Sequence, residues 1–257
     1  MDSQERKEAP LVQQVKQIVE DGKGCYGYRR VQAKLRQLGM IVNHKRLLRI
    51  MKQHGLQCTK FMPRADRKYS SYKGRVGQVA PNRTMRNFKA NHINHIWLTD
   101  VTEFALPMPG KRLYLSPIMD AYNSEIISYK LSHSPSIDII LDPLRRALTQ
   151  QTFKAETLVF HSDQGFQYQH QSTVQLLESH SVKQSMSRKG NCLDNAPMEN
   201  FFGLLKQEMF YRETFKSYED LENAIHEYIY FYNHQRIKTK LKGMSPVQFR
   251  EHTLKTA

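Results

Sequence analysis

The feature that most constrains the fold is a series of short runs rich in β-branched and aromatic residues, which begins at residue 96. The first three runs are residues 96–106, 113–122 and 125–132, and turn-forming stretches separate them. Such runs are typical of strands joined by tight turns. We therefore expect three consecutive antiparallel strands. After residue 136 the chain alternates between helical and strand-like patterns, which indicates a mixed sheet rather than a purely antiparallel one.

The rest of this region supplies the helices that would cover the sheet. Apolar residues at helical spacing predict helices, and short apolar runs predict further strands. Helices are expected at residues 136–150, 171–180, 196–210, 217–236 and 245–252, and strands at residues 157–163 and 182–187. The predicted fold class is therefore α/β, a mixed sheet flanked by helices.

The beginning of the chain is predicted to be helical. Helices are expected at residues 11–20, 28–39 and 43–55, with Asn43 as a cap and Gly39 and Gly55 as stops. Two helices joined by a four-residue turn, with basic outer faces, fit a helix-turn-helix. The residues expected to contact DNA here are Arg29, Arg30, Lys45 and Arg46. The alternative interpretation is a small structural helical hairpin.

The positive charge of the chain is concentrated before the predicted sheet. Residues 1–95 contain 21 Lys and Arg against 6 Asp and Glu, whereas residues 96–257 contain 18 of each. The formal net charge of +15 therefore belongs to the first part of the chain. A polyanionic partner such as nucleic acid is the direct interpretation, and a solvated basic surface is the alternative. We divide the chain into a DNA-binding segment (10–56), a basic linker (57–90) and a core with C-terminal helices (91–252).

Composition also bears on the compartment. No apolar run approaches the roughly 20 residues that a membrane span needs. The cysteines Cys25, Cys58 and Cys192 are far apart and form no C-x-x-C pair. This usage argues against a disulfide framework and a four-cysteine zinc site, and it suits a reducing cytoplasm. We expect a cytoplasmic protein with no membrane partner.

Three acidic residues occupy positions that suit a metal site. Asp100 lies inside the first predicted strand, Asp163 ends the fourth, and Glu199 falls early in a helix, separated from Asp163 by 35 residues. If the first and fourth strands are neighbours, the two aspartates meet at one edge of the sheet. Carboxylate oxygens are the ligands that Mg²⁺ prefers, and two such ions activate an attacking oxygen and stabilise a leaving one at phosphorus. Taken singly, the aspartates are also typical turn or cap residues, and the glutamate a typical first-turn residue.

The sequence around these acids makes the pattern specific. The matching runs are WLTDVT (97–102), LYLSPIMDAYNSEIISYKLS (113–132), VFHSDQGFQY (159–168), SMSRKGNCLDNAPMENFFGLLKQE (185–208) and YIYFYNHQRIKTKLKGMSPVQF (228–249). In order and spacing the chain resembles the insertion-sequence transposases of the second-reading-frame type, with a DDE integrase core. The upstream runs YGYRRVQAKL and NHKRLLRIMKQHGL resemble the small helix-turn-helix segment of these proteins. The resemblance covers about residues 20 to 250.

The resemblance implies an RNase-H-like core and a DNA transposase activity. It places Asp100, Asp163 and Glu199 at the catalytic triad that holds two Mg²⁺ ions, with Mn²⁺ able to substitute. The family hydrolyses a phosphodiester at the element's ends and then transfers the freed 3′-hydroxyl to another phosphodiester. The implied partners are double-stranded DNA (element ends and target), an upstream-reading-frame protein or fusion, and further copies of the chain in synapsis at the bacterial nucleoid.

Several basic residues near the triad are candidates for DNA contact. Lys206 lies seven residues after Glu199, two helical turns along the same face, and its family counterpart contacts terminal DNA. The alternative is an ordinary exposed lysine. Arg188 and Lys189 lie in a glycine-containing loop before the Glu199 helix, either over the DNA or as a solvated basic loop. His161 is expected either to orient Asp163 or a phosphate, or to be a structural histidine.

The chain also departs from the retroviral integrases that the family resembles. It lacks their paired histidines and cysteines, so we expect no structural zinc. Two other functions stay open on sequence alone. One is a non-catalytic DNA-binding regulator or inhibitor of transposition, which the basic first part of the chain would serve. The other is an RNA-directed nuclease of the same fold.

Overall fold

A computed structural model of the chain describes residues 3–60, 79–150, 157–188, 192–211 and 213–256. Most of the predicted linker and the predicted DNA contact Lys189 lie outside these residues. The chain forms two compact units. We call Ala65–Glu227 the sheet unit, and Met1–Arg64 together with Tyr228–Ala257 the terminal unit. None of the helices in the described ranges combines the length and apolar character needed to cross a membrane.

The sheet unit is built on one mixed sheet. Its strands are β1 (Ile96–Thr99), β2 (Thr102–Ala105), β3 (Arg112–Asp120), β4 (Glu125–Ser132), β5 (Val159–Ser162) and β6 (Lys183–Met186). β3 pairs antiparallel with β4, and also with β2 and β1 in succession. β5 joins β1 in parallel, and β6 joins β5 in parallel. The predicted mixed sheet is therefore confirmed. β1 and β5 are neighbours, which is the condition under which Asp100 and Asp163 were expected to meet at one edge.

One expectation is wrong in detail, because the first predicted strand is two strands that break at Asp100. The register of β1 on β3 continues unchanged into β2 and sets Asp100 opposite Pro117. Proline has no N–H to give to a ladder. The N–H of Val101 is taken by the Asp100 carboxylate, at 2.7 Å. Asp100 therefore lies at the carboxyl end of β1 and not inside a strand.

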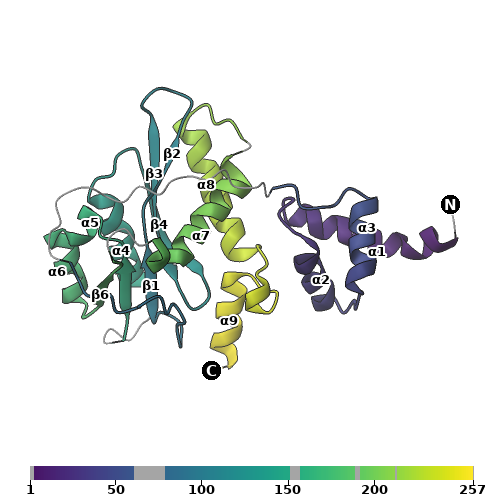
Figure 1. Ribbon diagram of the computed structural model, residues 1–257, viewed down its shortest axis with the longest axis horizontal. Helices are drawn as coiled ribbons and strands as arrows, with labels where there is room; N and C mark the ends of the chain where they lie inside the picture. Colours follow the sequence, from purple (N-terminus) through teal and green to yellow (C-terminus); the bar gives the residue numbers. More distant parts are fainter. Residues whose placement is uncertain (1–2, 61–78, 151–156, 189–191, 212, 257) are drawn as a thin grey trace. The chain divides into compact units, whose positions relative to one another are not determined.

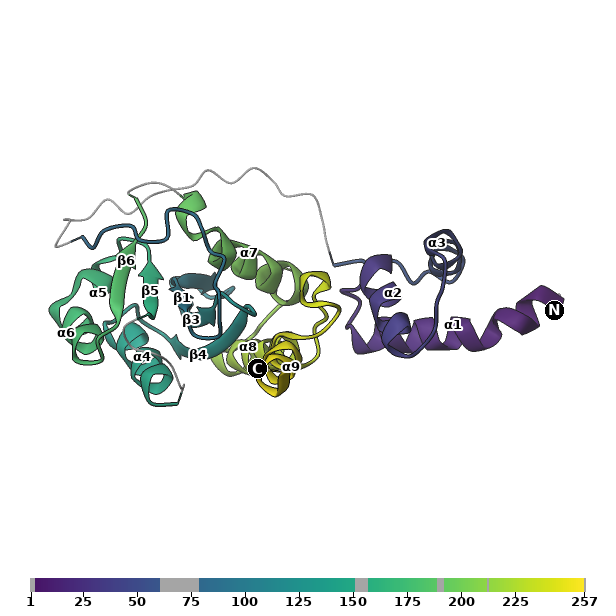
Figure 2. The ribbon, with the colours of Figure 1, turned by 90° about the horizontal axis from the view of Figure 1, so that it is seen from below.

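Helices cover both faces of the sheet. Figures 1 and 2 show α4 (Asp138–Gln150), α5 (Phe166–Gln169) and α6 (Gln171–Ser179) on one face and α7 (Ala196–Leu205) on the other. A 3₁₀ turn, Cys192–Asn195, precedes α7, and a π-helical turn, Lys206–Phe210, continues it. The short helix α5 was not predicted, because four residues are too few to show a helical period.

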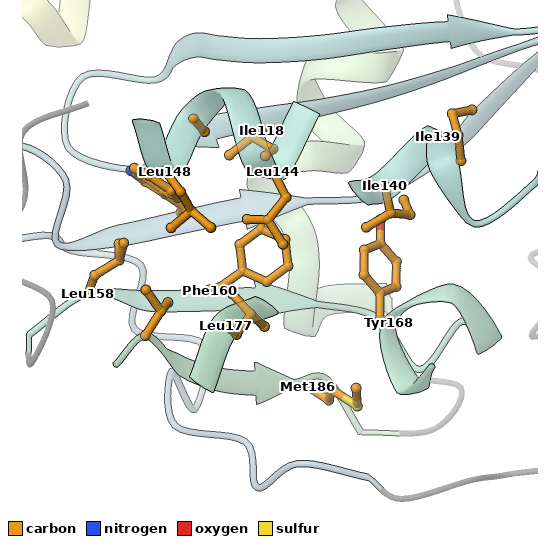
Figure 3. Close-up of a cluster of buried hydrophobic side chains, with 13 residues drawn as sticks. Ile118, Ile139, Ile140, Leu144, Leu148, Leu158, Phe160, Tyr168, Leu177 and Met186 are labelled. Atoms are coloured by element: carbon orange, nitrogen blue, oxygen red, sulfur yellow. The ribbon is translucent and has the colours of Figure 1, made fainter. Parts of the chain in front are cut away.

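The core of the sheet unit lies between the sheet and the helices α4 to α6 (Figure 3). Its buried members are Trp97, Ile118, Ile139, Ile140, Leu144, Ala147, Leu148, Leu158, Phe160, Tyr168, Leu177, Val182 and Met186. Burying a large apolar side chain stabilises a fold by about 1.5–3 kcal/mol. Because β5 contributes Phe160 and α5 contributes Tyr168, the core fixes the chain on both sides of Asp163.

The terminal unit contains the predicted helix-turn-helix. Its helices are α1 (Ser3–Asp21), α2 (Tyr28–Gln37) and α3 (His44–Gln53), joined by the end of α8 (Tyr218–His234), a 3₁₀ turn (Thr239–Leu241) and α9 (Pro246–Thr256). The predicted cap Asn43 is confirmed, since its side chain accepts from the N–H of Lys45 at 2.8 Å. The predicted stops Gly39 and Gly55 have positive φ angles of 78° and 64°, which glycine adopts without strain.

A buried tyrosine joins the two ends of the chain within the terminal unit. The Tyr26 hydroxyl donates to the carbonyl of Gln235 at 2.9 Å and accepts from the N–H of Ile237 at 3.0 Å. Nearby, the Gln37 amide donates to the carbonyl of Gly243 at 2.9 Å. The helix-turn-helix segment is thus hydrogen-bonded to the segment that follows α8.

We expect Tyr26→Phe to lower the free energy of unfolding of the terminal unit by about 1–3 kcal/mol, because the buried N–H of Ile237 and the carbonyl of Gln235 both lose the hydroxyl as a partner. Hydrogen exchange of the terminal unit in the full chain measures this. Tyr28→Phe is the matched control, since its hydroxyl bonds only the exposed side chain of Arg29. Equal protection in Tyr26→Phe and the control would contradict the role given to the buried hydroxyl.

Candidate active site

The parallel pairing of β1 and β5 brings the two aspartates to one edge of the sheet. The register pairs Trp97 with Phe160 and Leu98 with His161. Continued by two residues, it sets Asp100 opposite Asp163. Both residues directly follow their strands, so both lie at the carboxyl edge, where active sites of α/β sheets tend to form.

The electrostatics of the pair show that the carboxylates act on one another. Burial raises the pKa of Asp100 well above its usual range, and the charges of Asp163 and then Glu199 raise it further. The Val101 N–H and the charge of Lys206 oppose this rise. Burial also raises the pKa of Asp163, against a hydrogen bond from the Gly165 N–H. The negative charges of Asp163 and Glu199 therefore both disfavour ionisation of Asp100.

Asn195 ties the start of the helix that carries Glu199 to the end of β1. The Asn195 side chain is buried and donates to the carbonyl of Thr99, the residue before Asp100, at 3.0 Å. Asn195 immediately precedes α7, and Glu199 lies in the first turn of that helix. The hydrogen bond thereby fixes the first turn of α7 against the end of β1.

His161 supports the same helix start from β5. Its ring is fully buried, with Nε2 2.7 Å from the carbonyl oxygen of Asp194 and Nδ1 2.8 Å from the Ser185 hydroxyl. Because a carbonyl only accepts, Nε2 carries the proton and Nδ1 accepts from Ser185. Burial lowers the pKa of His161, which keeps the ring neutral. Of the two expectations for His161, the contacts fit the structural histidine.

Asp194 is the most heavily hydrogen-bonded side chain at the site. Its fully buried carboxylate accepts from the Asn82 amide (3.0 Å), from Arg86 Nε (2.8 Å) and from three N–H groups of Arg188 (2.9–3.0 Å). These bonds hold the pKa of Asp194 far below its usual range, and the Arg188 side chain is the largest cause. Asp194 thus joins the chain before β1 and the loop after β6 to the start of α7.

The loop after β5 holds Asp163 closely. The Gly165 N–H donates to Asp163 Oδ1 at 2.9 Å, and the Gln164 amide donates to the carbonyl of Ser187 at 3.0 Å. A Cβ placed on Gly165 would lie 3.0 Å from Asp163 Oδ1 and 3.3 Å from Gln167 Oε1. A side chain at this position would therefore require the Asp163 carboxylate to give way by a few tenths of an ångström.

Gly165→Ala is therefore expected to displace the Asp163 carboxylate and to lower DNA joining by about tenfold to a hundredfold, the cost of small misplacements at an active site. Stability should change little, because the φ of Gly165 is an ordinary −59°. Gly27→Ala is the matched control, as Gly27 also precedes a helix but has open space around its Cβ position. Full activity in Gly165→Ala would show that Asp163 tolerates the shift.

Two further residues of the sheet unit, Lys206 and Arg188, were predicted to contact DNA. Lys206 begins the π-helical turn, and its Nζ lies 5.2 Å from the centre of the Phe104 ring. Its charge lowers the pKa of Asp100, so the lysine lies on the side of the carboxylates. Arg188 is bound to Asp194, although its side chain stays 59% exposed.

The four residues of the terminal unit that were predicted to contact DNA differ in their surroundings. Arg30 donates to the carbonyl of Cys25 at 2.7 Å, so it stabilises the turn after α1. Arg29 and Lys45 are exposed. Arg46 is exposed too, but its Nε bonds Glu8 at 3.0 Å.

The donor set at the sheet edge has the chemistry of a site for a hard divalent cation. Burial and mutual repulsion disfavour the ionised forms of Asp100 and Asp163, and a divalent cation would reverse both effects. Among the described residues, no three His, Cys, Asp or Glu side chains stand close enough together to form a complete metal-binding group. In this structure Glu199 therefore contributes to the field of the aspartates without completing a cluster with them.

Sequence reasoning missed Asp194, Asn195 and Tyr168. The Tyr168 hydroxyl is buried 3.3 Å from Thr99 Oγ1, and burial together with the charges of Asp100 and Asp163 raises its pKa well above the usual value. A polar Asp-Asn pair directly before Ala-Pro is a helix-start signal. The signal shows where α7 starts, but it does not show that this start is hydrogen-bonded to the end of β1.

Comparisons with known proteins agree with this arrangement. Residues 90–192 and 199–254 match family models of the integrase core domain, and residues 5–63 match a model of an HTH-like domain. InsK of insertion sequence element IS150 from Escherichia coli (strain K12), which is described as a transposase, is 44% identical over 96% of this chain and 85% of its own length. A transposase-like protein of Haemophilus influenzae is 46% identical over 83% of this chain and 95% of its own length.

The fold has a counterpart among solved structures. A chain of the simian T-cell lymphotropic virus intasome, solved with the PP2A regulatory subunit B56 gamma, superposes with a TM-score of 0.50 at 18% identity. The match covers 85% of this chain and 70% of that one. It confirms the predicted RNase-H-like fold class. On sequence, domain content and fold, this chain belongs to the insertion-sequence transposases of the second-reading-frame type, with an HTH-like domain and an integrase core.

Proposed function

We propose that this chain is a DNA strand transferase whose catalytic residues are Asp100, Asp163 and Glu199. The observation that carries the proposal is the parallel register of β1 and β5, which sets the two aspartates opposite one another. The bond from Asn195 to the carbonyl of Thr99 ties the start of the Glu199 helix to the end of β1, which supports including Glu199. Family membership supports the class of reaction.

The three carboxylates are proposed to hold two Mg²⁺ ions, with Mn²⁺ able to substitute. When bound, the ions would activate an oxygen nucleophile and stabilise the leaving oxygen at phosphorus. The raised pKa values of Asp100 and Asp163 support this assignment, because such a pair gains most from a cation. Glu199 would approach the pair when ions and DNA are present.

The reaction consists of two displacements at phosphorus. In the first, water forms a bond to a phosphorus at the element's end, and the bond to the 3′ oxygen breaks, leaving a 3′-hydroxyl and a 5′-phosphate. In the second, that hydroxyl attacks the phosphorus of another phosphodiester, and the 3′ oxygen of the attacked phosphodiester leaves. One ester bond to phosphorus therefore replaces another. Lys206, beside the carboxylates, would contact the DNA that carries the reacting phosphate, and Arg188 and Lys189 would lie along it.

The remaining assignments concern DNA and partners. Residues 10–56 are proposed to bind double-stranded DNA through Arg29, Lys45 and Arg46, residues 57–90 to act as a basic linker, and residues 91–252 to form the catalytic core. For Arg30, a role in the turn after α1 is better supported than DNA contact. Joining two ends requires synapsis, so we propose a homo-oligomer on the nucleoid, together with an upstream-reading-frame protein or fusion.

A second candidate, a non-catalytic DNA-binding regulator, is favoured by one observation, the basic excess of residues 1–95. The two candidates differ in metal dependence. A regulator binds DNA equally well with and without Mg²⁺ and never joins ends.

A plasmid assay tests the proposal. The plasmid carries the gene, its upstream reading frame and its flanking DNA, and amplification detects joined element ends. Junctions with the wild type and none with Asp163→Asn are expected. Junctions with both would mean that the carboxylates are wrongly assigned, and junctions with neither would favour the regulator.

A further inference from the structure

Two arginines on the outer face of α3 are held by a carboxylate from α1. Glu8 Oε1 and Oε2 accept from Arg49 Nη2 at 2.6 and 2.8 Å, and Glu8 Oε1 also accepts from Arg46 Nε at 3.0 Å. The arginine side chains remain 47% and 43% exposed, whereas that of Glu8 is 13% exposed. The carboxylate is therefore covered by the arginines, and the outer parts of the guanidinium groups face solvent.

The pairing lasts over the whole physiological pH range. The hydrogen bond from Arg49 is the largest cause of a lowered pKa for Glu8, so the carboxylate stays ionised. One negative charge thus faces two positive ones on the helix that the helix-turn-helix arrangement would present to DNA. Arg49 has a further tie, because its Nη1 donates to Gln53 at 2.9 Å.

A carboxylate and a phosphate compete for the same donors of a guanidinium group. Both offer paired oxygens that accept parallel N–H bonds. Each phosphate contact by an arginine on duplex DNA releases counterions and steepens the salt dependence of binding by about 0.9 in log units. While Glu8 occupies these N–H groups, they are not available to a DNA phosphate.

We propose that Glu8 is a specificity-determining residue, an internal competitor that weakens binding of Arg46 and Arg49 to the phosphates of arbitrary DNA. Exposed Lys45 and Lys52 on the same helix have no such carboxylate partner among the described ion pairs. A specific site would displace Glu8 by supplying further contacts, whereas random DNA would not. The inference rests on the proposed DNA binding by this segment.

The test measures binding of the full chain to a random-sequence duplex over a series of salt concentrations. Glu8→Gln keeps a hydrogen-bond acceptor and removes the charge. We expect it to bind about tenfold more tightly near 0.1 M salt, with a salt slope steeper by about one to two. Glu20→Gln is the matched control, because it makes the same change of charge at an exposed position of α1.

A second set of variants removes the arginines that Glu8 binds. In a chain that also carries Arg46→Gln and Arg49→Gln, the gain from Glu8→Gln should disappear. Suppose that the wild type binds the duplex, but Glu8→Gln does not bind it more tightly, or Glu20→Gln gains as much affinity as Glu8→Gln. Either result would overturn the role of Glu8 and leave the proposed DNA binding standing. No binding by the wild type or by Glu8→Gln, even at low salt, would overturn the proposed DNA binding as well. Thermal unfolding of each variant checks that the change lies in binding and not in folding.

Discussion

Asp163→Asn is expected to lower DNA joining by about a thousandfold or more while raising the stability of the metal-free chain. The loss follows because a metal site with one ligand fewer forfeits several kcal/mol of charge stabilisation in the transition state. The gain follows because burial raises the pKa of Asp163 and the charge of Asp163 raises that of Asp100. The amide that replaces the carboxylate keeps the oxygen that accepts from the Gly165 N–H, so little else changes.

Two measurements separate this result from a folding defect. The single tryptophan, Trp97, is fully buried in the core of the sheet unit, so its fluorescence reports the unfolding of that unit. Tm should rise by about 2–4 °C for each kcal/mol gained. Added Mg²⁺ or Mn²⁺ should stabilise the wild type, as a ligand of the folded state does, and should have little effect on Asp163→Asn. A variant that loses stability without metal, or keeps its activity, would contradict the assignment.

Asp194→Asn is expected to lower the free energy of unfolding of the sheet unit by about 2–3 kcal/mol, in the range for hydrogen bonds to charged groups. Every group around this carboxylate is an N–H donor, from Asn82, Arg86 and Arg188. An amide nitrogen in place of one oxygen would face donors. DNA joining should fall by about a hundredfold, because the start of the Glu199 helix loses its anchor.

The pH dependence has a defined sign. The pKa of Asp194 is lowered by folding, so its contribution to stability is fully present above the unfolded value of about 3.8 and is lost as pH falls below that value. Trp97 fluorescence in denaturant titrations should therefore show a difference between wild type and Asp194→Asn that is constant at neutral pH and shrinks in acid. Arg36→Gln, on an exposed face of α2, is the control. A difference that persists unchanged in strong acid would mean that the carboxylate charge is not its source.

Local patterns predicted the elements well, because period and caps are properties of neighbouring residues. Asn43 caps α3 as expected, whereas the pairing of β1 with β5 was only a condition in the sequence analysis and came from the structure. The break at Asp100 was missed because its cause, Pro117, lies on another strand. Likewise, the partners of Asp194 come from segments about a hundred residues apart. The sequence pattern predicted the candidate acids, but it did not predict the contacts of Asp194 and Asn195 that hold the start of α7 in place.

The Tyr26 bonds also order events in time. A ribosome delivers the N-terminal helices first, and domains generally fold as units during synthesis. The hydrogen-bond partners of Tyr26, Gln235 and Ile237, are made last. The helix-turn-helix segment therefore gains these two hydrogen bonds only when translation has passed the sheet unit. A chain that ends before Gln235 would carry the basic helices without these hydrogen bonds, so the stability of the helix-turn-helix segment depends on residues that are synthesised after the sheet unit.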